Sequence, residues 1–146
     1  MNIPIHSDPI LITSLALPFA ASIIAGAIGR KFSRVAMIIT SISFVPLFIY
    51  ASYLLSLGKV YLVPLGPLPR PIGMVYLISD GLSNAFGLAV ALVGIALEIA
   101  SYPYMKHRFH VLGLPEQFDV YYLLFTLCAA SMELLIYAYN LLLIYI

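Results

Sequence analysis

Two glutamates, Glu98 and Glu133, each stand alone inside a long apolar stretch of the sequence. A carboxylate at the centre of a lipid-spanning helix costs about 2.5–3.5 kcal/mol on insertion scales, so such a side chain normally faces protein or water. Both residues are therefore candidates for a pathway that carries protons or other small cations. A structural role stays open for each. Glu98 could pair with Lys106 or Arg108 at the membrane interface, and Glu133 could accept a hydrogen bond from a neighbouring helix.

The other polar side chains in this half of the chain have simpler interpretations. Asp80 precedes an apolar run and is expected to cap its helix, with Ser83 at the third helical position. Lys106, His107 and Arg108 follow the run and form an interfacial basic cluster. The three histidines and one cysteine of the chain do not fall at metal-ligand spacing. The sequence therefore predicts no metal site, no cofactor and no catalytic residue.

The composition places these few charges in a membrane protein. The 146 residues are 63% hydrophobic and 9% charged, with a mean hydropathy of +1.06, whereas a soluble domain is about 25% charged. Such a chain holds four or five spanning helices of about 20 residues each, and its net charge of +1 gives no argument for nucleic acid. We expect an all-α integral membrane protein, with residues 1–146 forming a single domain in the lipid bilayer of a cell (or inner) membrane.

Hydropathy and proline positions divide the chain into four spanning helices and the start of a fifth. Pro46 is expected to kink the second helix, and Pro103 stands near the end of the third. Four prolines within residues 64–71 cannot continue a helix, and the β-prone runs on both sides predict an ordered loop or a small hairpin on the membrane surface. The expected helices are 9–29, 35–58, 81–102 and 119–138, the fifth starts at 141–146, and the surface loop is 59–79.

The lysines and arginines are distributed unequally between the two sides of the predicted bundle. Three follow the first helix and two follow the third, while two lie in the surface loop: Arg30, Lys31, Arg34, Lys106 and Arg108 on one side, Lys59 and Arg70 on the other. By the positive-inside rule, the side with five is cytoplasmic. The N-terminus and the proline-rich loop are then predicted to lie outside.

Several motifs follow one another from Asp80 onward. Asp-Gly-Leu-Ser opens the third helix at Asp80, and Ser-Tyr-Pro-Tyr-Met closes it at 101–105. A short polar loop leads to an aromatic-led fourth helix, and Asn-Leu-Leu-Leu at 140–143 opens a leucine-rich fifth. Over these residues the chain resembles the N-terminal part of the antiporter-like membrane subunits. That family includes the proton-pumping subunits of respiratory complex I, the large subunits of Mrp cation/proton antiporters and their counterparts in membrane-bound hydrogenases.

The resemblance implies a membrane-arm subunit of a complex I-like, redox-driven proton or sodium pump, such as NADH-quinone oxidoreductase. Such a subunit couples electron transfer to ion translocation and binds no redox cofactor itself. The essential glutamate and lysine of the family belong to later helices, so the sequence is expected to be a split subunit or an N-terminal portion. Its partners are then other membrane subunits, above all a chain that supplies the remaining antiporter helices.

Two points limit what the resemblance transfers to this chain. Pro103 replaces the glycine that the family usually has in its Tyr-Xaa-Tyr-Met motif, and Glu98 and Glu133 match no residue that the family is known to use. Two other hypotheses stay open: a small structural or assembly accessory protein of the membrane, and a part of an Mrp-type antiporter or a membrane-bound hydrogenase.

Overall fold

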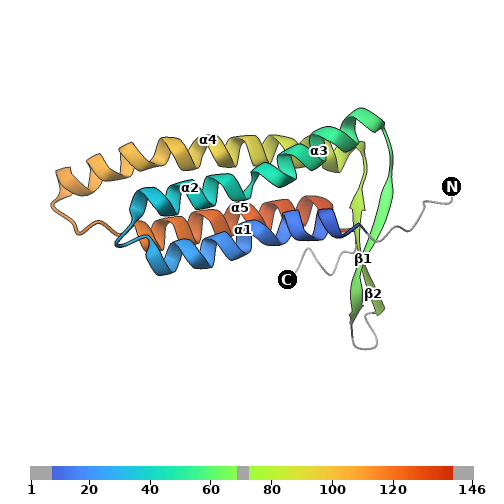
Figure 1. Ribbon diagram of the computed structural model, residues 1–146, viewed down its shortest axis with the longest axis horizontal. Helices are drawn as coiled ribbons and strands as arrows, with labels where there is room; N and C mark the ends of the chain where they lie inside the picture. Colours follow the sequence, from blue (N-terminus) through green and yellow to red (C-terminus); the bar gives the residue numbers. More distant parts are fainter. Residues whose placement is uncertain (1–7, 69–72, 140–146) are drawn as a thin grey trace.

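The computed structural model describes residues 8–68 and 73–139, which form helices lying side by side with a two-stranded hairpin across one end (Figure 1). The helices are α1 (Pro9–Ile28), α2 (Ser33–Ser43), α3 (Val45–Leu57), α4 (Gly81–Leu112) and α5 (Phe118–Tyr137), and the strands are β1 (Tyr61–Leu68) and β2 (Gly73–Ser79). Within the described residues, four helical segments are long and apolar enough to cross a membrane, with α2 and α3 counted together. The four predicted helices of spanning length are thus confirmed. The predicted start of a fifth helix, 141–146, lies outside the described residues.

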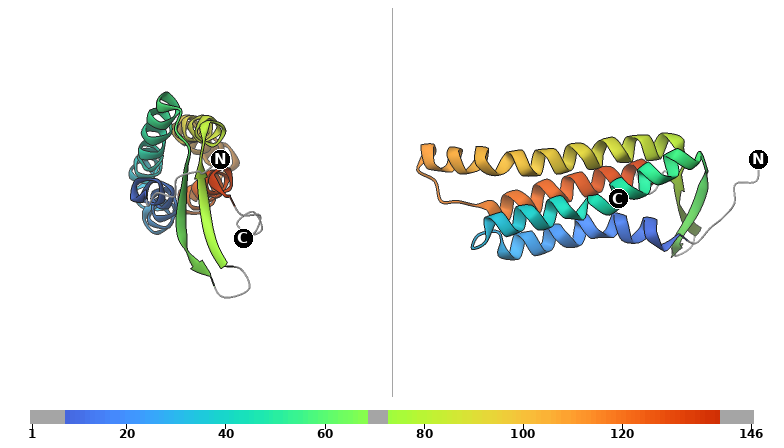
Figure 2. Two further views of the ribbon diagram at one scale, coloured as in Figure 1. Left: turned by 90° about the vertical axis from the view of Figure 1, so that its right-hand side faces the viewer. Right: turned by 45° about the horizontal axis from the view of Figure 1, so that its top comes forward.

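The predicted surface loop contains an antiparallel hairpin, so the fold is not purely helical. Tyr61 lies opposite Ser79 at one end of the pairing, and the register shifts between Pro64 and Gly66. Proline has no backbone N–H, and it is tolerated here because each strand of a two-stranded sheet has an unpaired edge. The strands run across the end of the bundle rather than along it (Figure 2). Residues 69–72 of the predicted loop lie outside the described residues.

The second predicted helix is divided where its proline forces a break. α2 ends at Ser43 and α3 begins at Val45, which places Pro46 in the first turn of α3. Proline has no N–H to donate to the carbonyl four residues earlier, that of Ile42, but it is well suited to the first turn of a helix. The kink predicted at Pro46 is therefore present, and the break itself lies at Phe44.

The predicted end of the third helix at Tyr102 is wrong, because α4 continues through Pro103 to Leu112. Proline removes only one backbone hydrogen bond, and a helix survives it when neighbouring elements hold both halves. Phe118 of α5 does so here: its ring stacks on Tyr102 at a centroid distance of 5.4 Å and meets Phe109 edge-on at 5.5 Å. The helix stops instead at Gly113, whose φ of 64° is left-handed and suits glycine.

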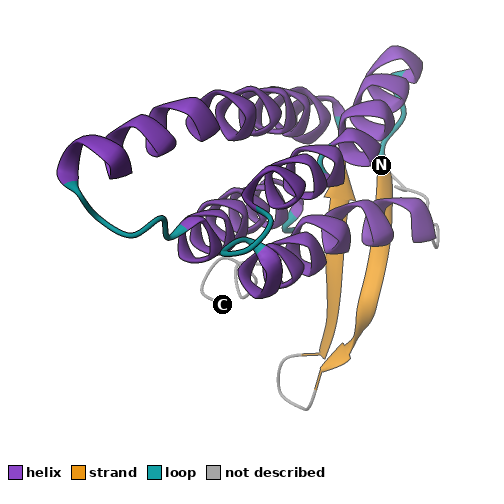
Figure 3. Cartoon of the chain, turned by 60° about the vertical axis from the view of Figure 1, so that its left-hand side comes forward, coloured by secondary structure: helices purple, strands orange, loops and turns teal. Residues whose placement is uncertain are grey.

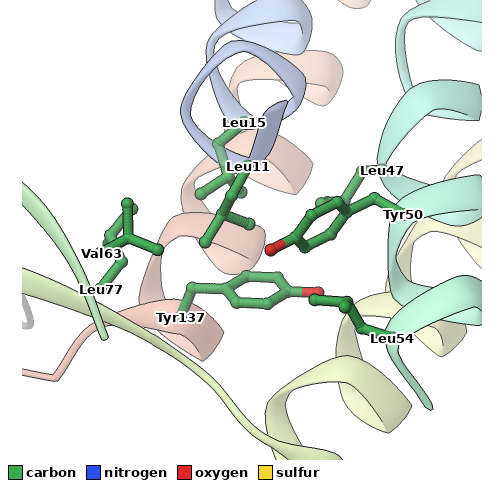
Figure 4. Packing of buried hydrophobic residues seen from close by; sticks show 8 residues of the cluster. All are labelled: Leu11, Leu15, Leu47, Tyr50, Leu54, Val63, Leu77 and Tyr137. Carbon is green, nitrogen blue, oxygen red and sulfur yellow. The ribbon is translucent and has the colours of Figure 1, made fainter. Parts of the chain in front are cut away.

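Two apolar clusters hold the two ends of the bundle together. The larger one joins α1, α3 and α5 to the hairpin (Figure 4), and it consists of Leu11, Leu15, Leu47, Tyr50, Leu54, Val63, Leu77 and Tyr137. The smaller one is built from Ala25, Ala36, Phe118 and Tyr122. The second cluster lies at the end where the α1–α2 and α4–α5 connections are found (Figure 3). The chain after α5 is also fixed to the hairpin, because the Tyr139 N–H donates to the Tyr76 carbonyl at 3.2 Å.

Asp80 caps α4, as its position in the sequence suggested. Its backbone is extended, and its side chain accepts a hydrogen bond from the Ser83 N–H at 2.7 Å.

Asp80→Ala is expected to lower the free energy of unfolding by about 1 kcal/mol, because the Ser83 N–H loses its acceptor. The measurement is the unfolding midpoint in mild detergent. Asp80→Asn keeps a capping oxygen and should stay close to wild type. Equal midpoints for the alanine and asparagine variants would show that the cap contributes nothing.

Candidate functional site

Glu98 lies fully buried on the inner face of α4. The Thr126 hydroxyl of α5 donates to its Oε1 at 2.7 Å, while Oε2 has no hydrogen-bond partner among the described residues. The hydroxyls of Thr40 and Ser41 lie close by on α2 and donate to carbonyl oxygens of that helix. Three helices thus surround this carboxyl group, and one hydrogen bond fixes it.

The length of α4 changes the surroundings expected for Glu98. The sequence placed this residue within two turns of the helix end, within reach of Lys106 or Arg108. The helix continues to Leu112, about 21 Å beyond Glu98 at 1.5 Å per residue, and both cations are exposed on those later turns. The hydrogen-bond partner of Glu98 is therefore Thr126 of the facing helix α5, and not a cation at the end of α4.

Glu133 is fully buried on the inner face of α5, and neither of its carboxyl oxygens has a hydrogen-bond partner among the described residues. The alternative proposed from sequence was a hydrogen bond from a neighbouring Ser, Thr or Tyr, and within the described part of the chain no such bond reaches it. An unpaired charge in apolar surroundings is very costly, so this group requires a proton, a cation or water as its partner. Glu133 is therefore the stronger of the two ion-pathway candidates.

A chain of hydrogen bonds begins one helical turn beyond Glu133. The Tyr137 hydroxyl donates to Asn84 Oδ1 at 3.2 Å, and Asn84 Nδ2 donates to Ser79 Oγ at 3.1 Å. All three side chains are completely buried. Gly87 gives the tyrosine its space, because a Cβ there would lie only 2.5 Å from the phenol oxygen. These bonds join α5, α4 and β2 at the hairpin end of the bundle.

A second tyrosine extends the polar groups toward the surface. Tyr50 lies beside Tyr137 in the larger apolar cluster (Figure 4) and close to Ser79. Its hydroxyl donates to Oδ2 of Asp8 at 3.0 Å, and Asp8 is only half-buried at the start of α1. Two sets of hydrogen-bonded polar groups therefore lie at the hairpin end of the bundle, and one of them includes a carboxylate that solvent can reach.

The two buried carboxyl groups lie at different levels of one interior column. Thr126, the partner of Glu98, precedes Glu133 by two turns of α5, which is about 10 Å along the axis. Phe44, from the break between α2 and α3, is fully buried against Gly94, one turn before Glu98 on the antiparallel α4. An aromatic ring thus lies at a level between the two carboxyl groups.

The predicted basic cluster is divided between two faces of α4. Lys106, His107 and Arg108 are exposed and helical, near the end of α4 rather than beyond it. Lys106 and His107 line a cleft with Arg34 of α2. Arg108 lies outside this cleft and donates to the Tyr104 hydroxyl at 3.2 Å.

Three buried polar residues of the site, Thr126, Asn84 and Tyr137, are not among the candidates predicted from the sequence. For Thr126 and Tyr137 the signal is the spacing of one helix face: the buried positions of α5 recur every three or four residues, and most of them carry a hydroxyl or carboxyl group. These positions are Phe118, Tyr122, Thr126, Ala130, Glu133 and Tyr137. Asn84 belongs to the buried face of α4, with Gly87, Ala91, Gly94 and Glu98. Polar residues that recur along the buried face of an apolar helix indicate where a neighbouring helix supplies hydrogen-bond partners.

Thr126→Val is expected to lower the free energy of unfolding by about 1–2 kcal/mol, because it keeps the side-chain shape and removes the donor to Glu98. Thr126→Ser keeps the hydroxyl and is the matched control. Chemical unfolding in detergent measures both. Equal stability of the two variants would show that this bond does not hold α4 to α5.

No group of three His, Cys, Asp or Glu side chains within the described residues is placed to hold a metal ion. In sequence comparisons, no protein-family model and no curated protein matches the chain. The function must therefore be argued from the buried carboxyl groups, the spanning helices and the resemblance of the motifs.

Proposed function

We propose that the chain is a membrane-arm, antiporter-like subunit of a complex I-like, redox-driven proton or sodium pump. Four helices of spanning length provide the scaffold, and the motifs from Asp80 onward provide the resemblance. The subunit lies in a cell or inner membrane and binds no redox cofactor itself. It works with other membrane subunits, including one that supplies the remaining antiporter helices.

Glu133 carries this proposal, because it is fully buried and neither oxygen has a partner among the described residues. A carboxyl group that only holds helices in register is normally tied to a donor, as Glu98 is tied to Thr126. A group without such a tie is free to accept and release a proton or a cation as the complex turns over. The hydroxyls and amides from Tyr137 to Asp8 supply polar contacts toward the hairpin end.

The distribution of positive charge supports one orientation in the membrane. Five of the seven lysines and arginines belong to the end with the α1–α2 and α4–α5 connections, and Lys59 belongs to the hairpin end. The positive-inside rule then places the hairpin and the N-terminus outside.

A structural or assembly role is the second candidate function, and it is favoured by the buried hydrogen bonds between α4 and α5. Thr126 with Glu98 and Tyr137 with Asn84 join these two helices at two levels. In an accessory protein, such bonds would fix helix register and have no part in ion flow. A place in an Mrp-type antiporter or a membrane-bound hydrogenase is a variant of the first proposal with other partner subunits.

Purification in mild detergent through an affinity tag, with mass spectrometry of every co-purifying chain, tests the proposal. Recovery with hydrophilic iron–sulfur subunits and a longer antiporter-like chain supports a redox pump and names its type. Recovery with Mrp subunits and no iron–sulfur protein would move the assignment to an antiporter. Recovery alone would overturn the pump proposal and favour the accessory role.

A further inference from the structure

A cleft of about 410 Å³ lies between α2, the later turns of α4 and the α4–α5 loop. Its basic side chains are Arg34, Lys106, His107 and His110, and the one carboxylate among the described residues that line it is Glu116. The three residues from α4 recur at helical spacing and so lie on one face of the helix. Basic side chains from separate helices thus converge on one concave surface.

Arg34 is oriented within this cleft by an aromatic side chain. Its Nε donates to the Tyr102 hydroxyl at 3.2 Å, and its guanidinium carbon lies 5.9 Å from the centre of the same ring. The bond engages Nε, so the terminal nitrogens are the part of the guanidinium fork that can face an anion. A guanidinium held in this way matches the oxygens of a phosphate group.

The depth of the cleft corresponds to the headgroup layer of a bilayer. Tyrosines gather at this end of α4 and α5, namely Tyr102, Tyr104 and Tyr121, and Tyr104 is 61% exposed; tyrosines placed in this way are typical of the membrane interface. α4 has 32 residues, about 48 Å, against roughly 30 Å for the hydrocarbon core. Its last turns, with Lys106 and His110, therefore extend out of the hydrocarbon.

Apolar surface adjoins the cleft on its membrane side. Ile38 lies one turn from Arg34 on α2 and is 49% exposed, and Ile99 lies one turn before Pro103 on α4 and is 51% exposed. A free phosphate ion would use only the charges of the cleft. A phospholipid uses both parts, with its phosphate among the cations and its acyl chains along the isoleucines.

We propose that this cleft binds the phosphate headgroup of an anionic phospholipid from the leaflet at the α1–α2 end of the bundle. Basic pockets between membrane helices recognise such headgroups. The site rests on the chain spanning a membrane, which is part of the proposed function, and it does not depend on ion translocation.

The test measures lipid preference of the purified protein, in whatever complex it forms, in nanodiscs of phosphatidylcholine with increasing phosphatidylglycerol of matched acyl chains. Bound lipid is counted by native mass spectrometry after release into detergent. Wild type is expected to retain phosphatidylglycerol in preference to phosphatidylcholine. Lys106→Gln should reduce that preference about fivefold, which corresponds to about 1 kcal/mol for one cation at the headgroup layer. Glu116→Gln should increase it, because it neutralises the carboxylate that lines the cleft.

Arg108→Gln is the matched control, since it removes the same charge two residues away on a different face of α4. Its preference is expected to stay within about twofold of wild type. Equal losses of lipid preference in the Lys106 and Arg108 variants would show that the lipid is attracted by the overall positive charge of this surface and not by the cleft. Displacement of the lipid by millimolar inorganic phosphate would make free phosphate the ligand, and no preference in wild type would overturn the proposal outright. None of these outcomes bears on whether Glu133 conducts ions.

Discussion

Replacing Glu133 with glutamine is expected to lower ion translocation by the assembled complex by about a hundredfold or more, the scale at which a positioned proton-transfer group contributes. Glutamine has nearly the same shape as glutamate and fits the same fully buried space on α5. It cannot release a proton or balance a cation. The amount of assembled complex should therefore stay near wild type while the transport rate falls.

Glu98→Gln is the matched control for Glu133→Gln. The substitution is the same and the side chain is just as buried, but the glutamine oxygen can still accept the Thr126 hydroxyl. The measurement is the rate of proton or sodium uptake into proteoliposomes at constant electron-transfer rate, beside the amount of complex. A wild-type rate in Glu133→Gln removes this residue from the mechanism. Loss of assembly in both variants, with normal transport per complex, would favour the accessory role.

The sequence predicted that both glutamates face protein or water rather than lipid, but not what surrounds them. Burial follows from the cost of a charge among apolar residues, which is a local property of the sequence. The contact between Glu98 and Thr126 joins residues 28 positions apart, and its register depends on where α4 ends and how the loop returns. Because the helix was expected to end at Tyr102, ten residues too early, that register could not be derived.

The early helix end has a physical cause. Hydropathy reports contact with lipid, so it falls at the membrane surface even when the helix continues. A helix end inferred from hydropathy therefore leaves Lys106, His107 and Arg108 beyond the helix. The helix actually stops at Gly113, where the backbone turns left-handed. Phe118 packs against Tyr102 before Pro103 and against Phe109 after it. No local sequence pattern reveals this contact between two helices.

Elements whose limits are set by local chemistry were predicted more closely. Asp80 begins α4 through its own side chain, and Pro46 breaks the second span because proline has no N–H for the carbonyl four residues earlier. The hairpin was one of two alternatives for the surface loop. The structure contains the hairpin, with Pro64 and Pro67 in its first strand. Proline is tolerated there because each strand of a two-stranded sheet has an edge with no hydrogen-bond partner strand.

Gly29→Ala is expected to produce the largest loss of stability among the substitutions considered, about 3 kcal/mol, near the upper end of overpacking costs. Gly29 follows α1, where that helix approaches the start of α5. A Cβ at this position would lie 2.8 Å from the Cα and 2.9 Å from the backbone nitrogen of Asp119. Backbone atoms cannot rotate away as a side chain can, so α1 and α5 would have to separate. The unfolding midpoint in detergent and the yield of folded protein should both fall.

Gly81→Ala is the matched control, because a Cβ at this first residue of α4 meets no atom within 4 Å. It should leave the midpoint unchanged or raise it by less than about 1 kcal/mol, since alanine restricts the unfolded chain. Equal behaviour of the two variants would show that α1 and α5 do not approach so closely.

The contact also bears on the proposed site, because α5 carries Glu133 and packs along α1. A separation that begins at Gly29 should therefore open the core around the buried carboxyl groups, and transport should fall together with stability in Gly29→Ala. In Glu133→Gln, transport should fall while stability is kept.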